Sequence, residues 1–131
     1  MIQKIVFYIE KVPEGYRYCV ENSDKSMVMV GIDSVPELMF QLEQVCNLCA
    51  ENAGQAKITE DMITVKYDLP ALFDFYKEVN WAALSRRIGI SKSMLSHYKN
   101  GHRQPSPKQL HRILAGIHEL GQELSKLNLI I

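Results

Sequence analysis

Side chains able to make specific hydrogen bonds are concentrated in one short segment, the run LSRRIGISKSMLSHYKNG from Leu84 to Gly101. If a helix over residues 92–100 turns its apolar residues inward, five polar positions remain outside. These positions are Lys92, Ser93, Ser96, His97 and Asn100. They are short or flexible donors and acceptors, and such groups contact base edges and phosphates. The segment therefore indicates a surface that contacts nucleic acid.

The charges of the same region support this interpretation. No Asp or Glu occurs from Val79 to His118, and this stretch contains seven cations: Arg86, Arg87, Lys92, Lys99, Arg103, Lys108 and Arg112. Such a surface gains affinity by displacing counterions from phosphates, so its binding falls steeply as salt rises. The simpler alternative is a solvated basic face on a helical bundle. We favour DNA binding, and we add Lys99 and Arg103 to the predicted contact residues.

Two short helices must position these side chains. Asn80 is a cap for a helix over 81–88, which Gly89 ends, and Ser91 caps a second helix over 92–100. The residues expected to face inward are Leu84, Ile88, Ile90, Leu95 and Tyr98. This is the spacing of a helix-turn-helix, in which the first helix braces the second and the second enters the major groove.

Residues 81–113 resemble the XRE/Cro family of helix-turn-helix domains. The family pattern L-A-x-x-x-G-x-S-x-x-x-[IVL]-S-x-x-x-x-G is followed from Leu84 to Gly101, except that Ser85 stands where the family usually has Ala. The resemblance implies that Trp81 and Asn100 lie near the DNA backbone. It also implies a set of base-facing residues, namely Lys92, Ser93, Ser96 and His97.

The first half of the chain alternates apolar and polar residues with a period of two, which indicates strands. Three antiparallel strands are predicted over 2–11, 16–21 and 27–32. The period then changes, because Ser34 and Glu37 form a capping-box pattern at the start of a helix expected over 35–51. A fourth strand is expected over 62–67. The sequence therefore predicts a β-β-β-α-β unit with one sheet face covered by the helix.

The junction between the third strand and this helix has the pattern G-x-D-S-x-x-E-L, formed by Gly31, Asp33, Ser34, Glu37 and Leu38. With the order of elements, it resembles the HicB-like antitoxins of bacterial toxin-antitoxin pairs. The resemblance implies a truncated RNase H-like unit, generally without catalytic residues, that neutralises a small ribonuclease toxin. It also implies a DNA-binding unit that represses the shared operon. The predicted fold is α+β: a partial RNase H-like domain over 1–68 and an all-α helix-turn-helix bundle over 69–131.

The formal net charge of zero is a cancellation between these halves. Residues 1–70 carry six Lys and Arg against eleven Asp and Glu, whereas residues 71–131 carry nine against four. The acidic half suits a basic ribonuclease as its partner, and the basic half suits DNA. No run of eighteen apolar residues and no secretory leader is visible, so we expect a cytoplasmic protein that does not enter a membrane.

Other candidate chemical groups are interpreted as structural. Cys46 and Cys49 form a CxxC within an apolar helical stripe, and no second pair completes a zinc site, so we predict buried thiols. Glu10, Glu21 and Asp33 lie on or beside strands and leave open a nuclease of RNase H type. We interpret the unit as non-catalytic. The sequence therefore predicts no enzymatic activity, no metal and no cofactor.

A final helix is predicted from Pro107, with Ser106 as its cap. Its apolar residues recur at spacings of three and four: Leu110, Ile113, Ile117, Leu120, Leu124 and Leu127. An internal core stripe and a dimer contact explain this seam equally well. A homodimer or higher homo-oligomer would read a palindromic operator with two recognition helices. The alternative function is a standalone transcription regulator whose N-terminal domain dimerises or senses a ligand.

Overall fold

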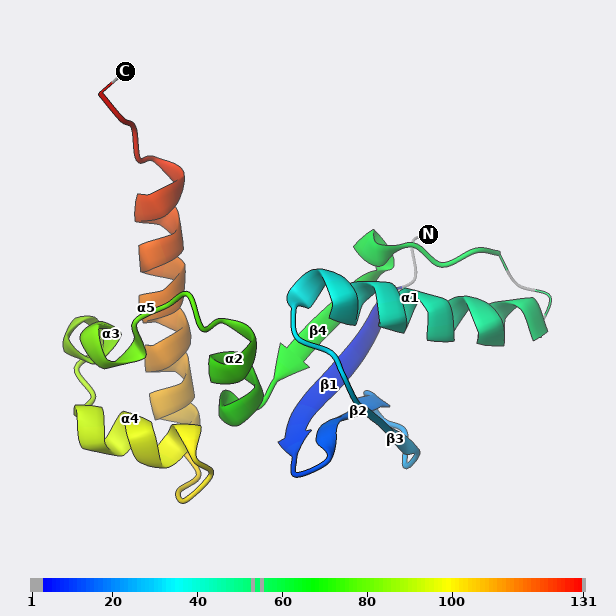
Figure 1. Ribbon diagram of the computed structural model, residues 1–131, viewed down its shortest axis with the longest axis horizontal. Coiled ribbons are helices and arrows are strands. Elements are labelled where there is room, and N and C mark those ends of the chain that lie inside the picture. The colour runs from blue at the N-terminus through cyan, green and yellow to red at the C-terminus, as the bar shows by residue number, and fades with distance from the viewer. Residues whose placement is uncertain (1–3, 53, 55, 131) are drawn as a thin grey trace. The chain divides into compact units, whose positions relative to one another are not determined.

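The computed structural model describes residues 4–52, 54 and 56–130 and divides the chain into two compact units. The first unit is Met1–Phe75 and contains a four-stranded mixed sheet with helices. The second unit is Tyr76–Ile131 and is helical (Figure 1). The predicted α+β class is therefore confirmed.

The sheet of the first unit has the order β3-β2-β1-β4. Its strands are β1 (Ile5–Val12), β2 (Gly15–Val20), β3 (Ser26–Met29) and β4 (Ile63–Tyr67). The first three are antiparallel neighbours, as the sequence predicted, and β4 pairs parallel with β1. β3 ends at Met29 rather than at residue 32. Met29 pairs with Tyr16 of β2, and β2 begins only one residue before Tyr16, so no partner strand remains for residues 30–32.

Helix α1 (Val35–Asn52) covers one face of this sheet (Figure 1). The capping box predicted for it is present. The backbone N–H of Glu37 donates to the hydroxyl of Ser34 at 3.4 Å, and the Glu37 carboxylate accepts from the backbone N–H of Asp33 at 3.1 Å. Leu38 and Leu42 are fully buried, and each contributes about 1.5–3 kcal/mol by leaving water. These contacts fix the first half of α1 against the sheet.

The second half of α1 is less covered, which corrects one prediction. Cys46 is half-buried, and its burial raises the pKa of the thiol, whereas Cys49 is exposed. The expectation that both thiols are buried is therefore wrong for Cys49. The physical reason is that a cavity, described below, separates the last turns of α1 from the sheet.

A 3-10 turn, η1 (Glu60–Met62), leads into β4, and α2 (Leu69–Phe75) follows it. The Asp68 carboxylate caps α2 by accepting from the backbone N–H of Ala71 at 2.9 Å. The ring centroids of Phe75 and Tyr16 lie 4.5 Å apart, and the Tyr16 hydroxyl donates to the Asp74 carboxylate. Because α2 packs on the sheet in this way, it belongs to the first compact unit, although the sequence analysis placed the domain boundary after residue 68.

The second unit consists of α3 (Trp81–Ile88), α4 (Lys92–Lys99) and α5 (Pro107–Ser125). Ile113 of α5 is buried, but Leu110 and Leu124 of the same predicted seam are exposed. Only part of the seam is thus used inside the chain. No helix among the described residues is long and apolar enough to cross a membrane.

Candidate nucleic-acid interface

The turn between α3 and α4 is defined by hydrogen bonds from capping residues. The side chain of Asn80 accepts from the backbone N–H of Ala83 at 3.0 Å, and the Ser91 hydroxyl accepts from that of Met94 at 3.1 Å. Gly89 lies between the helices in the left-handed conformation (φ 71°), where glycine avoids the strain that a side chain would cause. Contacts between neighbouring residues therefore determine where both helices start and where α3 ends.

A small apolar core fixes the orientation of α4. All five residues predicted to face inward, Leu84, Ile88, Ile90, Leu95 and Tyr98, are buried. Helix α5 closes this core with Ile113 and approaches α3 very closely at Gly116. A β-carbon on Gly116 would lie 2.0 Å from Cγ2 of Ile88, so the two helices can meet at this distance only because residue 116 has no side chain. This contact was not predicted from the sequence, although a glycine in the middle of a helix can indicate close packing.

Ser85 occupies the position at which the XRE/Cro family usually has Ala. It is 4% exposed, and its hydroxyl lies 2.6 Å from the backbone carbonyl of Ala82, to which it donates. The buried polar atom is thus satisfied within its own turn of α3. The departure from the family pattern therefore leaves no unpaired group in the core.

The outer face of α4 is exposed along its whole length. The exposed residues include every predicted contact residue of this helix and its cap, namely Lys92, Ser93, Ser96, His97, Lys99 and Asn100. Leu95 and Tyr98 occupy the buried face between them. The helix therefore presents cations, hydroxyls, an imidazole and an amide together, and these are groups able to contact base edges.

The segment after α4 is attached to the last turn of that helix. The carbonyl of His97 accepts from the backbone N–H of His102 at 2.9 Å and from that of Arg103 at 3.4 Å. The amide of Asn100 donates to the hydroxyl of Ser96 at 3.5 Å. These bonds hold Arg103, which is exposed, next to the C-terminal end of α4. The two predicted contact residues Asn100 and Arg103 thus extend the surface of α4.

Trp81, the remaining predicted contact residue, lies at the start of α3 and is half-buried. Its indole N–H donates to the backbone carbonyl of Tyr76 at 3.1 Å. This bond ties the start of α3 to the preceding segment. A contact of Trp81 with the DNA backbone would accordingly use the face or edge of the ring rather than its N–H group.

One of the seven predicted cations is used inside the second unit. The guanidinium of Arg87 on α3 donates to Glu119 at 3.2 Å and to both carboxylate oxygens of Glu123, the two acidic residues of α5. Arg87 was predicted to belong to the basic surface, because both carboxylates lie just beyond the stretch without Asp or Glu. The other six cations have no carboxylate within ion-pair distance among the side chains that the structure describes.

Replacing Glu123 with Gln is expected to destabilise the second unit slightly at neutral pH. The hydrogen bond from Arg87 lowers the pKa of Glu123, so the carboxylate contributes stability above its unfolded pKa, and this contribution is lost as pH falls through its folded pKa. Urea unfolding followed by Trp fluorescence at pH 7 and at acid pH measures the difference. Glu78→Gln, at an exposed position, is the matched control and should show no difference at either pH.

Two of the three carboxylates that left a nuclease activity open make contacts with other side chains. Glu21 accepts from the Tyr8 hydroxyl at 2.8 Å and lies 3.8 Å from Lys66, while Glu10 lies 3.8 Å from Arg17. In the part of the chain that the structure describes, no group of three or more His, Cys, Asp or Glu side chains is placed to hold a metal ion.

Comparison with known proteins agrees with the geometry of the second unit. The helix-turn-helix family model HTH_3 matches residues 77–117, which include α3, α4 and the first part of α5. No curated protein and no solved structure matches the chain. The chain thus contains an XRE-type helix-turn-helix domain at residues 77–117, which supports a DNA-binding transcription regulator.

Proposed function

We propose that this protein is an antitoxin-type repressor with two binding surfaces. The helix-turn-helix binds operator DNA through α4, and the N-terminal unit neutralises a small ribonuclease toxin encoded beside it. The observation that carries the DNA part is the exposed polar face of α4 on a braced helix within the matched helix-turn-helix region. The β-β-β-α-β order of the first unit supports the HicB-like part, because the resemblance rests on that layout.

The first unit has features that suit a protein partner. β3 is an edge strand of the sheet, with Met27 62% exposed, and Val30 just after it is 70% exposed. An edge with exposed apolar side chains is normally covered, because unpaired strands associate with other chains. The excess of acidic residues in this half would attract a basic ribonuclease. We therefore place the toxin on the first unit.

Co-expression with the small open reading frame adjacent to its gene tests the toxin part. The two proteins should purify as a stable complex, and co-expression should restore growth that the small protein alone inhibits. Met27→Lys together with Val30→Lys should weaken the complex, whereas Leu114→Lys in the second unit should not. Absence of both the complex and the growth rescue would contradict the antitoxin role and leave the DNA-binding role standing.

We also propose that α5 forms a homodimer contact. Leu124 and Leu127 belong to the predicted seam and are 55% and 69% exposed, which is unfavourable for apolar side chains that have no partner. A dimer pairs the two recognition helices, so each copy can read half of a palindromic operator.

Replacing Leu124 with Glu is expected to raise the dissociation constant of this dimer at least tenfold, because a charge would be buried in an apolar contact. Sedimentation velocity across a dilution series measures the constant. Leu114→Glu, at an exposed position of α5 outside the seam, should leave it unchanged. A wild-type protein that remains monomeric at high concentration would contradict the contact.

A further inference from the structure

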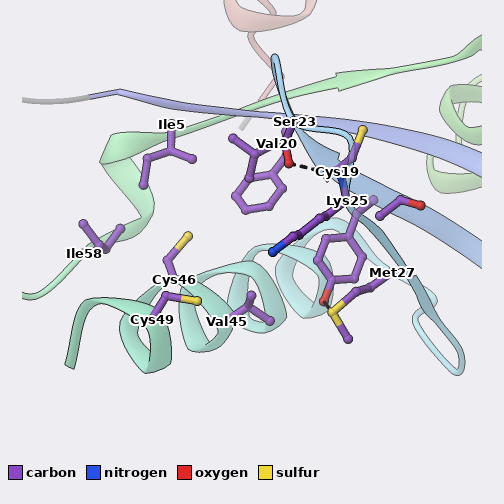
Figure 2. Close-up of a pocket in the computed structure, with 13 residues that line it drawn as sticks. Ile5, Cys19, Val20, Ser23, Lys25, Met27, Val45, Cys46, Cys49 and Ile58 are labelled. Carbon is purple, nitrogen blue, oxygen red and sulfur yellow. Dashed lines mark hydrogen bonds between the residues drawn. The ribbon is translucent and has the colours of Figure 1, made fainter. Parts of the chain in front are cut away.

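The first unit contains a cavity of about 510 Å³ between the sheet and the second half of α1 (Figure 2). Its walls are mainly apolar and include Phe7 and Tyr18 of the sheet and Val45 of α1. The thiols of Cys46 and Cys49 add soft, weakly polar surface to the wall formed by α1. This volume lies within the range of pockets that hold small molecules.

Three exposed polar residues of the lining, Ser23, Lys25 and Ser26, come from the turn before β3 and from its first residue. The Tyr18 hydroxyl is a further polar group of the lining, and it donates to the sulfur of Met27 at 3.5 Å. The backbone N–H of Lys25 donates to the Ser23 hydroxyl at 3.2 Å, which fixes the turn. In Figure 2 the side chain of Lys25 runs from this turn into the cavity, toward the wall that α1 forms. One cation and two serine hydroxyls therefore lie at the edge of a mainly apolar cavity.

Lys25 differs in its surroundings from the neighbouring cations of the unit. Lys11 lies 3.5 Å from Asp74, and Arg17 and Lys66 each lie 3.8 Å from a glutamate. Lys25 has no such carboxylate among the side chains that the structure describes. Lys25 is exposed, so its ammonium stays hydrated at the open side of the cavity. It can pair there with an anion whose apolar part covers the walls.

We propose that the cavity binds a small amphipathic carboxylate. The apolar body of the ligand lies against Phe7, Tyr18 and Val45, and its carboxylate pairs with the Lys25 ammonium and accepts from the nearby serine hydroxyls. This site is separate from the proposed operator surface, and it shares Met27 with the proposed toxin surface. It gives the chain a ligand whether or not a toxin partner exists.

Titration calorimetry of the full-length protein with decanoate and with decanol tests this site. Decanoate should bind several-fold more tightly than decanol, since only the acid pairs with Lys25 and this pair is exposed to water. Lys25→Gln should remove this preference and leave decanol binding as it was. Lys126→Gln, an exposed lysine of the second unit, is the matched control and should retain the preference.

Filling the cavity tests its location. Val45→Trp should weaken decanoate binding at least tenfold, whereas Leu48→Trp should not, because Leu48 is on the same helix but outside the lining and is 64% exposed. Circular dichroism confirms that each variant is folded, and if Val45→Trp unfolds, Cys46→Phe replaces it. The proposal is overturned if decanoate does not bind, if decanol binds as tightly, or if the filling variants bind decanoate as the wild type does.

Discussion

Replacing Gly116 with Ala is expected to lower the free energy of unfolding of the second unit by about 1–3 kcal/mol, the usual cost of overpacking a core. The added β-carbon would lie 2.0 Å from Cγ2 of Ile88, so α3 and α5 must separate. Ile88 is buried, and its β-branched side chain is restricted at χ1, so Cγ2 has little freedom to move away. Urea unfolding measures this loss, because the single Trp of the chain, Trp81, lies in the second unit.

The same helix provides a matched control. Gly121 also lies on α5, but nothing stands within 4 Å of the place where its β-carbon would be. Gly121→Ala should therefore stabilise the unit by about 0.5–1 kcal/mol through helix propensity alone. In an Ile88→Ala background, which lacks the clashing atom, Gly116→Ala should cost much less. Equal effects of the two Gly→Ala changes would contradict the close packing of α3 on α5.

Replacing Lys92 or His97 with Ala is expected to weaken binding to the specific operator by about 1–3 kcal/mol each, or roughly 5- to 150-fold. Both side chains are exposed on the outer face of α4, the second helix of the matched helix-turn-helix. In such motifs the second helix enters the major groove. The losses should be smaller on unrelated DNA, because contacts to bases carry the sequence preference. Fluorescence anisotropy on both duplexes at one fixed salt concentration measures the difference.

His111→Ala and Lys126→Ala are the controls for these two variants. Both residues are exposed and lie outside α4, on α5 and at its C-terminal cap. Their replacement should leave the preference for operator over unrelated DNA unchanged. If Lys92→Ala and His97→Ala also left this preference unchanged, the assignment of α4 as the recognition helix would be wrong.

The parts of the fold set by local residues were predictable from the sequence. The bounds of α3 agree with the prediction residue for residue, because Asn80 and Gly89 determine its ends through bonds to adjacent backbone. Four of the five inward residues of the helix-turn-helix were also predicted from the period of 3.6, which places them on the inner side of α3 or α4. The fifth, Ile90, was predicted to fill the corner between the two helices. The strands of the first unit follow from their alternation in the same way, except for the end of β3, which depends on its partner strand.

The features that sequence analysis missed depend on residues far apart in the chain. Arg87 meets Glu119 and Glu123 more than thirty positions later, so its charge is removed from the basic surface only in the folded unit. The tight contact at Gly116 requires knowing which helix faces it. The exposure of Cys49 depends on how much of α1 packs against the sheet. The apolar stripe in the sequence predicts which side of the helix is buried, but not how far along the helix the contact extends.

The central claim is tested most directly by binding of the wild-type protein to the DNA upstream of its own gene, compared with a shuffled duplex of the same composition. The account predicts that the native duplex binds at least a hundredfold more tightly. For both duplexes, the logarithm of the binding constant should fall linearly with the logarithm of the salt concentration, because cations on this surface displace counterions from the phosphates. Equal affinity for the two duplexes, or no binding to either, would contradict it.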